Sequence, residues 1–357
     1  LPEFKEELQK LLDKNKDKWR KNAIGETQKY IDGLVERATT RELDWGVEVP
    51  VKGYENKRIY VWIEAVLGYL STADKVLRER GLNPDEILSD NNQNLRVYMV
   101  HGKDNIPFHT TIFPALELAI GDNYRLPDYI ISSAYVNLNN EKMSKSKGNL
   151  ISVNELLELF NKDTLRFYFI FNGPEAKDIS CSIEEMITVH NKFLVGTLGN
   201  FINRNFSFID KKFEGIITEG TVDSKIKETT LNTYKEVGEL IEKGELKSAL
   251  SKVMDYISLG NKYYDENTPW IKVKENIEEF NDITYTCTYM IVNIANLIRP
   301  FLSETSDKIL NMLDISKESN WQEKEITGNI KIVNNELLFN RIDDEETKSI
   351  MDKLNNK

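Results

Sequence analysis

The pattern of secondary structure changes once along this chain, near residue 173, and that change limits the folds open to it. Before it, short apolar stretches alternate with segments of helical period, and residues 59–63, 97–101 and 129–132 are predicted to be buried strands. Helices between strands indicate a parallel sheet covered on both faces. After Gly173 and Pro174 the strand signals almost vanish. The sequence therefore predicts an α/β part followed by an all-α part.

The second part has the pattern of an antiparallel helix bundle. Residues 182–185 read Ser-Ile-Glu-Glu, a capping box that opens a long helix whose apolar residues recur at helical spacing. Further amphipathic runs are expected at about 224–243, 245–264, 277–299 and 303–313. The residues after 313 are polar and mixed, and we expect them to wrap back over the body.

The segment before the first strand reads as a connector made of two helices. The first helix is rich in lysine, and the second is expected to carry Ile31, Leu34, Val35 and Ala38 on one face. Further along, residues 107–120 have helical period, with a proline suited to a first turn.

Composition excludes several classes of protein. No stretch reaches the roughly 18 uninterrupted apolar residues that a membrane-spanning helix requires, so no membrane partner is expected. Cys181 and Cys287 are the only cysteines and are far apart, which argues against a disulfide framework and a zinc knuckle and fits a reducing cytoplasm. A net charge of −11 argues against nonspecific coating of nucleic acid.

A lysine-rich loop carries the clearest chemical signal. Residues 142–146 read Lys-Met-Ser-Lys-Ser and run on into Lys-Gly-Asn. Lys142 and Lys145 could bring ammonium groups onto a polyphosphate and stabilise the charge that develops in phosphoryl or nucleotidyl transfer. From composition alone, a cluster of lysine, serine and glycine is more often a solvated surface loop.

This lysine-containing sequence motif resembles the second signature of class I aminoacyl-tRNA synthetases. Three further motifs, at residues 40–46, 60–65 and 102–109, resemble those of the methionyl-tRNA synthetase family in order and spacing. The family's first signature, a His-Ile-Gly-His motif, is absent, since the only histidines are His101, His109 and His190. We therefore expect the chain to correspond to the C-terminal portion of such an enzyme, without the first half of its nucleotide-binding domain, and to be inactive alone.

The resemblance implies four domains and a set of site residues. The expected limits are a connector at 1–45, the second half of a Rossmann-like catalytic domain at 46–172, a helical anticodon-binding domain at 173–345 and a tail at 346–357. Arg41, Lys142 and Lys145 match catalytic positions, and Gly102, Asp104 and Lys145 match positions that bind ATP. The positions that match the family's methionine pocket are Trp62, Ala65, Tyr69 and His109.

These residue types suit the roles that the resemblance implies. An aromatic cage packs well against a thioether, although Trp62 and Tyr69 could instead be ordinary core residues. Gly102 allows close approach of a ligand, and the Asp104 carboxylate can accept both ribose hydroxyls, although a plain turn with a capping aspartate is the alternative. His109 alone would more often be structural.

The helical part contains candidates for reading the anticodon. Asn200 and Arg204 lie one helical turn apart, and Trp270 is expected in a loop between helices. An amide, a guanidinium and an indole suit recognition of an unstacked RNA loop, whereas a sealing aromatic and solvated polar groups are the alternative. The resemblance assigns all three to the anticodon of tRNA(Met).

The expected function is therefore methionine–tRNA ligation. Its expected partners are methionine, ATP with Mg²⁺, and tRNA(Met), with no metal or zinc site in these residues, and oligomerisation through a domain outside this chain is left open. Two alternatives remain: a noncatalytic module that binds the tRNA anticodon, and a class I synthetase for leucine, isoleucine, valine or cysteine. The words containing Trp62 and Asn200 argue against the latter.

Overall fold

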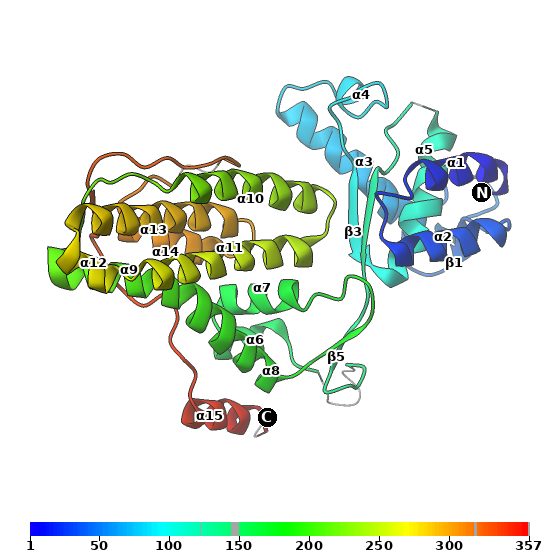
Figure 1. Cartoon of the computed structure of the whole chain (residues 1–357). Coiled ribbons are helices and arrows are strands. Elements are labelled where there is room, and N and C mark those ends of the chain that lie inside the picture. Colours follow the sequence, from blue (N-terminus) through cyan, green and yellow to red (C-terminus); the bar gives the residue numbers. More distant parts are fainter. Residues whose placement is uncertain (122, 144–149, 318–319, 356–357) are drawn as a thin grey trace. The chain divides into compact units, whose positions relative to one another are not determined.

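The computed structural model describes residues 1–121, 123–143, 150–317 and 320–355 (Figure 1). They form two compact units: Leu1–Tyr135 with Pro174–Asp178, and Val136–Gly173 with Ile179–Lys357. Strands alternate with helices in the first unit, whereas helices dominate the second, so the predicted fold class is confirmed. Division by compactness places residues 136–173 with the helical unit, which differs from the boundary expected near residue 173.

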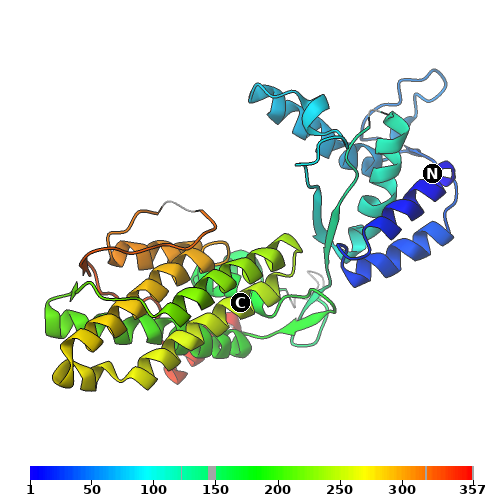
Figure 2. The same cartoon turned by 45° about the horizontal axis from the view of Figure 1, so that its top comes forward.

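A parallel strand pair forms the centre of the first unit. β3 (Tyr98–Gly102) pairs with β4 (Tyr129–Ser133), which confirms the two later predicted strands. A parallel pair needs a crossover connection, and the helical residues 103–120 belong to it. α2 (Lys21–Asp32) contacts β4, and α1 (Lys5–Lys14) lies beside α2 (Figure 2).

Strand β3 is covered on one face only by the residues that the structure describes. Met99 and His101 are half-buried, whereas Tyr98, Val100 and Gly102 are exposed, and Val100 is 72% exposed. The expectation of a sheet covered on both faces is therefore wrong for this strand.

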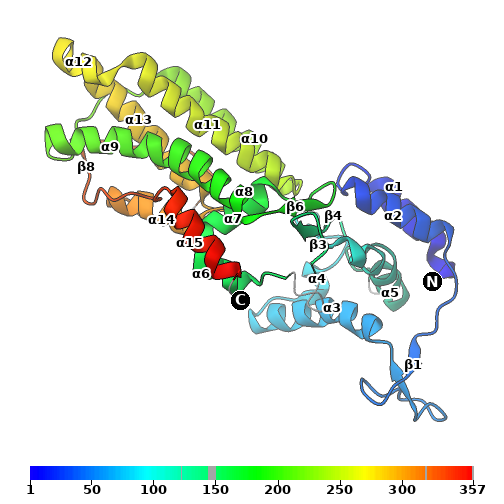
Figure 3. The ribbon, with the colours of Figure 1, turned by 90° about the horizontal axis from the view of Figure 1, so that it is seen from below.

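The predicted strand at residues 59–63 is wrong. β2 (Lys57–Ile59) ends there, pairs antiparallel with β1 (Thr40–Glu42), and is followed by α3 (Val61–Glu79). A short apolar run does not by itself distinguish a strand from the start of a buried helix. Here Val66 continues the apolar pattern at helical spacing and is buried. The β1–β2 ribbon stands apart from the central strand pair (Figure 3).

The predicted helix at residues 107–120 is confirmed, with an unusual first part. A 3₁₀ turn, η2 (Lys103–Asn105), precedes a π-helical turn, η3 (Phe108–Ile112), and α5 (Phe113–Ile120) follows. Gly121, with a φ of 80°, ends the helix in the left-handed conformation that glycine favours. π-turns occur frequently at functional sites, and this one carries the candidate residue His109.

The N-terminal segment expected to be a connector is helical, but its second helix is shorter than expected. A 3₁₀ turn, η1 (Pro2–Phe4), precedes α1, and α2 ends at Gly33, a poor helix former. Ile31 is buried, whereas Leu34, Val35 and Ala38 lie beyond the helix. The predicted common face of these four residues is therefore wrong.

The second unit confirms the predicted helices in the described part of the chain (Figure 3). The four amphipathic runs are α10, α11, α13 and α14, and the long helix predicted from residue 182 runs through α8, η5 and α9. The elements are α6 (Val153–Leu159), α7 (Lys162–Phe171), α8 (Ile183–Val189), the π-helical η5 (His190–Gly199), α9 (Asn200–Phe213), α10 (Ser224–Glu242), α11 (Leu246–Asn267), α12 (Pro269–Glu275), α13 (Ile277–Ile298), α14 (Ser303–Met312) and α15 (Asp344–Asn355).

The predicted cap at residue 182 is present, but the capping box is incomplete. The Ser182 hydroxyl accepts a hydrogen bond from the Glu185 backbone N–H at 3.1 Å. The Glu185 carboxylate instead accepts one from the hydroxyl of Tyr168, which ties α8 to α7. Sequence spacing identifies the cap but not this competing partner.

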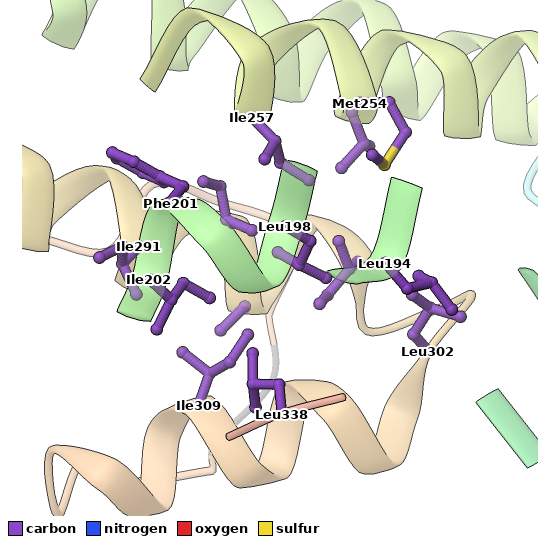
Figure 4. Close-up of a cluster of buried hydrophobic side chains, with 14 of the residues drawn as sticks. Leu194, Leu198, Phe201, Ile202, Met254, Ile257, Ile291, Leu302, Ile309 and Leu338 are labelled. Atoms are coloured by element: carbon purple, nitrogen blue, oxygen red, sulfur yellow. The ribbon is translucent and has the colours of Figure 1, made fainter. Parts of the chain in front are cut away.

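The core of the helical unit surrounds α13. Every residue of α13 from Ile283 to Ile298 is buried, as expected for a helix enclosed on all sides. Figure 4 shows part of this core, where Leu198 and Phe201 lie beside Ile257. Apolar packing of this kind is the main source of the unit's stability.

Two buried asparagines of α13 attach the polar segment that follows α14. The side chain of Asn293 accepts a hydrogen bond from the Lys324 backbone N–H at 2.8 Å and donates one to its carbonyl at 3.0 Å. Asn296 donates to the carbonyls of Asn320 at 2.9 Å and Gln322 at 3.0 Å. The expected wrapping of this segment over the body is confirmed.

Short strand pairs complete the helical unit, and a short helix completes the first. β5 (Val136–Leu138) pairs in parallel with β6 (Ile179–Cys181), β7 (Ile216–Ile217) pairs antiparallel with β8 (Ile330–Lys331), and α4 is Pro84–Ile87. Both cysteines, in β6 and α13, are buried. No helix among the described residues combines the length and apolar character needed to cross a membrane.

Gly260 in α11 allows a close approach of Phe201 from α9. A Cβ atom at this position would lie 2.6 Å from the Phe201 ring, whose side chain is fully buried. We expect Gly260→Ala to lower the free energy of unfolding by about 1 to 3 kcal/mol, despite the higher helix propensity of alanine. Urea denaturation followed by circular dichroism measures this change.

Gly25→Ala in α2 is the matched control. No atom lies within 4 Å of the Cβ position there, so alanine should be neutral or stabilising by up to about 1 kcal/mol. Equal effects of the two substitutions would show that the Phe201 contact does not require glycine.

Candidate functional site

The candidate methionine residues of α3 meet the π-helical turn η3. Trp62, Ala65 and Tyr69 follow one another at helical spacing and therefore lie on one side of α3. The Trp62 ring stacks on Phe108, with ring centroids 4.2 Å apart and planes inclined by 19°. Contrary to the sequence expectation, Trp62 lies in the first turn of a helix rather than at the end of a strand.

Tyr69 and His109 form a hydrogen-bonded pair. The Tyr69 hydroxyl lies 3.0 Å from Nε2 of His109, and Nδ1 of His109 lies 2.8 Å from the carbonyl oxygen of Asn105. Because a carbonyl only accepts, Nδ1 carries the proton and Nε2 accepts from the tyrosine. Burial lowers the pKa of His109, so the ring is neutral at neutral pH.

A second histidine connects this pair to the end of β3. The rings of His101 and His109 stack with centroids 4.3 Å apart. Nδ1 of His101 donates to the Gly102 carbonyl at 3.0 Å, while its Nε2 is buried without a hydrogen-bond partner. Burial lowers the pKa of His101 to about 4. Two stacked neutral imidazoles therefore border the carboxyl end of this strand.

The two candidate nucleotide residues follow directly. Gly102 ends β3, and a Cβ atom there would meet no protein atom within 4 Å, so its surroundings leave room for a ligand. Asp104 lies in η2, is exposed, and accepts a hydrogen bond from the Tyr135 hydroxyl. Asp104 also borders a cavity of about 520 Å³ that Lys103 and Tyr30 help to line.

Arg41 lies in a different environment from the other candidates. Its guanidinium donates to the carbonyls of Ala38 at 2.7 Å and Thr40 at 2.9 Å, and stacks 4.2 Å from the Tyr60 ring centroid. Arg41 and Phe108 both line an apolar cavity of about 190 Å³. The cavity thus connects Arg41 to the aromatic stack only through Phe108.

The lysine loop is described only in part. Lys142 is exposed and belongs to the second compact unit, four residues after the end of β5 at Leu138. Lys145 lies outside the described residues. Their catalytic assignment therefore stays a prediction from the sequence.

The candidate anticodon residues gather in the helical unit. Arg204 of α9 lies 5.9 Å from the Trp270 ring centroid and 4.8 Å from that of Tyr264, and forms an ion pair with Asp265 at 2.5 Å. This pairing raises the pKa of Arg204 and lowers that of Asp265. The result is a cation held between two aromatic rings and a carboxylate.

The other two candidates differ in their surroundings. The Asn200 amide donates to the side-chain oxygen of Asn261 at 2.9 Å, which leaves its own carbonyl oxygen able to accept. Trp270 is 40% exposed. It occupies the first turn of α12 after the left-handed Thr268, so the expected loop is in fact a short helix.

Sequence reasoning missed several residues that contact these candidates. Phe108 was within reach, because it stands next to His109 in the same sequence word. Tyr264 and Asp265 precede Trp270 closely, but a helix of mixed polar and aromatic residues gives no sign that they would contact Arg204. Tyr135 lies 31 residues from Asp104, and no local pattern predicts that contact.

Comparison with known proteins defines the family. The family model described as tRNA synthetases class I (M) matches residues 1–206, and the anticodon binding domain of methionyl tRNA ligase matches residues 217–357. The chain belongs to the class I tRNA synthetases of the (M) family. The resemblance to the methionyl-tRNA synthetase family, inferred from the four sequence motifs, is confirmed.

The similar curated proteins are methionine–tRNA ligases. The chain is 42% identical over 344 residues to methionine–tRNA ligase 1 of Alkaliphilus oremlandii, covering 96% of this chain and 63% of that protein. It is 39% identical to the ligase of Bacillus cereus strain G9842, covering 98% of this chain and 64% of that protein. The chain thus spans just under two thirds of the length of these relatives.

Solved structures share the fold. Methionyl-tRNA synthetase of Mycobacterium tuberculosis in complex with methionyl-adenylate aligns with a TM-score of 0.76 at 24% identity, covering 88% of this chain and 62% of that chain. Its free form aligns with a TM-score of 0.80 at 21% identity, covering 95% and 67%.

The described residues contain no group of three or more histidine, cysteine, aspartate or glutamate side chains arranged to hold a metal ion.

The pKa of His101 gives a testable prediction. Its folded-state value of about 4 lies below the unfolded value of 6.5, so the unfolded chain binds more protons between these pH values. Stability should therefore fall as the pH is lowered from 6.5 towards 4, by about 2 kcal/mol at pH 5 from this group.

NMR of the imidazole protons measures this pKa directly, and His101→Gln assigns the signal. The variant should also lose part of the acid sensitivity of unfolding. A His101 titration at or above pH 6.5 in the folded protein would contradict the burial described here.

Proposed function

We propose that the complete protein containing this chain is a methionine–tRNA ligase. It joins methionine to ATP as methionyl-adenylate and transfers the methionyl group to tRNA(Met). The observation that carries the proposal is the meeting of Trp62, Tyr69 and His109 at the carboxyl end of β3, next to Gly102 and Asp104. Ligands of open α/β sheets bind at this end of parallel strands.

The aromatic side of α3 suits the methionine side chain. A thioether is polarisable and packs favourably against ring edges, and Trp62 and Tyr69, on the same side of α3 as Ala65, supply such rings together with His109. An apolar pocket separates side chains that differ by one methylene by only about 1 to 3 kcal/mol. Close analogues such as norleucine should therefore be activated to a measurable extent.

The chemistry needs positioning and charge stabilisation more than acid–base groups. The methionine carboxylate is ionised at neutral pH and attacks the α-phosphorus of ATP, while the bond from that phosphorus to the bridging oxygen of pyrophosphate breaks. Lys145, assisted by Lys142, stabilises the negative charge on the triphosphate. Asp104 accepts the ribose hydroxyls, and Arg41 supports activation.

Methionyl transfer completes the reaction. A hydroxyl of the terminal adenosine of tRNA attacks the acyl carbon, the new ester bond forms, and AMP leaves with the electrons of the broken mixed-anhydride bond. Magnesium enters with ATP, coordinated by its phosphate oxygens.

The helical unit recognises the anticodon in this proposal. Trp270 offers a half-open indole on which an unstacked base can lie, and Arg204 and Asn200 supply donors and acceptors for base edges. The match of residues 217–357 to an anticodon binding domain supports this role for the helical unit and covers Trp270, whereas Asn200 and Arg204 precede the matched residues. The partners are methionine, ATP and tRNA(Met), and the reaction takes place in the cytoplasm.

A noncatalytic module that only binds tRNA is the alternative. It shares the anticodon residues but needs neither Lys145 nor the aromatic side of α3. Retained tRNA binding without adenylate formation by the complete protein would favour it.

The first test of catalysis is Lys145→Ala in the complete protein. Loss of this ammonium group should lower methionine-dependent exchange of pyrophosphate into ATP by about 10²- to 10³-fold, with little change in methionine affinity. Lys75→Ala, on the solvated side of α3, is the matched control and should retain full activity. An unchanged exchange rate in Lys145→Ala would remove the catalytic assignment.

Trp270→Ala tests recognition of the anticodon. Stacking on an aromatic contributes about 1 to 3 kcal/mol per base, so charging of tRNA(Met) should fall by about 10- to 100-fold while adenylate formation stays unchanged. Ile271→Ala removes a neighbouring exposed apolar side chain and should affect neither step. Equal losses of charging and adenylate formation in Trp270→Ala would contradict the assignment.

A further inference from the structure

A tyrosine outside the predicted sites contacts the carboxylate assigned to the nucleotide. The hydroxyl of Tyr135 donates a hydrogen bond to Oδ1 of Asp104. We propose that Tyr135 is a positioning residue that holds the Asp104 carboxylate in the orientation needed to accept the ribose hydroxyls of ATP. This inference rests on the proposed function, in which Asp104, and not Tyr135, touches the nucleotide.

Asp104 needs a second group to fix its orientation. It lies on the short turn η2 and is exposed, so water would otherwise solvate the carboxylate in many orientations. A carboxylate has about four lone-pair sites on its two oxygens. The tyrosine therefore fixes one oxygen and leaves Oδ2 and part of Oδ1 for two ribose hydroxyls.

Tyr135 is itself fixed by an ion pair. Its backbone N–H donates to Oδ1 of Asp178 at 2.9 Å, and Nζ of Lys103 lies 2.7 Å from the same oxygen. The Lys103 ammonium also lies 3.9 Å from the centroid of the Tyr135 ring, a favourable cation–π position. Lys103 and Asp178 thus hold the backbone and the ring of Tyr135 at once.

The segment that supplies Asp178 is attached to the first unit at two other points. The Ala134 backbone N–H donates to the Pro174 carbonyl at 2.8 Å, and Arg20 pairs with Glu175 at 3.1 Å. These contacts place residues 174–178 in the first unit, although their neighbours in sequence belong to the second. Asp178 is therefore a fixed point for Tyr135.

The direction of the hydrogen bond follows from the charges. The hydrogen bond to Asp104 is the main reason why the pKa of Tyr135 is raised. The hydroxyl is therefore protonated at neutral pH and donates to the ionised carboxylate. A hydrogen bond to a charged group is stronger than a neutral one and is shorter and more directional. This makes Tyr135 suited to orienting Asp104.

The experiment compares ATP with 2′,3′-dideoxy-ATP as substrates for methionine-dependent pyrophosphate exchange by the complete protein. Tyr135→Phe keeps the ring that Lys103 contacts and removes only the hydroxyl. We expect the preference for ATP, as a ratio of kcat/KM values, to fall by about five- to tenfold, while the KM for methionine stays unchanged. A general loss of structure would lower the kcat/KM values for both nucleotides by the same factor and leave their ratio unchanged.

Two further variants sharpen the comparison. Lys103→Met removes the ammonium group at similar side-chain length and should lower the ratio less than Tyr135→Phe does. Tyr129→Phe, in β4 of the same unit, is the matched control and should keep the wild-type ratio.

The remaining outcomes separate this inference from the proposed function. An unchanged ratio in Tyr135→Phe would overturn the positioning role, and a higher ratio would overturn it by showing that Tyr135 competes with the ribose for Asp104. A wild-type protein that exchanges pyrophosphate but uses both nucleotides equally would refute the Asp104 assignment itself. A wild-type protein without exchange would refute the proposed function.

Discussion

The candidate site of the first unit depends on one buried, neutral imidazole. His109 joins α3, η2 and the end of β3, because its two nitrogens bond Tyr69 and the Asn105 carbonyl while its face stacks on His101. The π-helical turn that carries it widens the helix at this point. Loss of the neutral form would place a charge between apolar rings, which burial opposes. The aromatic side of α3 and the turn η2, which carries the candidate residue Asp104, therefore share one hydrogen-bonded connection.

In the function proposed above, the helical unit presents a cation to RNA while that cation stays paired within the protein. Arg204 is paired with Asp265 and lies near the rings of Tyr264 and Trp270. An arginine held in this way loses little conformational freedom when it binds a base edge. The carboxylate also offsets its attraction for phosphates, which agrees with the acidic net charge of −11. We therefore propose that recognition of RNA by this unit depends on shape and stacking more than on overall charge.

Some of the structure could be predicted from the sequence, and the reasons for success and failure are physical. Long amphipathic runs such as α11 and α13 carry enough periodic residues to define a helix, and the words around Lys142 and His109 defined the family. Short apolar runs were less informative, as residues 59–63 show. Contacts between distant residues, such as Tyr135 with Asp104 or Arg204 with Asp265, have no local signal because tertiary packing creates them. Gly33 ended α2 earlier than the apolar pattern indicated.

The two cysteines have a consequence for how this protein unfolds. Both thiols are buried, burial raises the pKa of each, and both belong to the helical unit. Alkylating reagents attack the exposed thiolate, so each modification event records a transient opening of the helical unit. The first unit carries no cysteine, so its own openings leave no such chemical mark. The rate of cysteine alkylation thus reports transient opening of the helical unit separately from opening of the first unit.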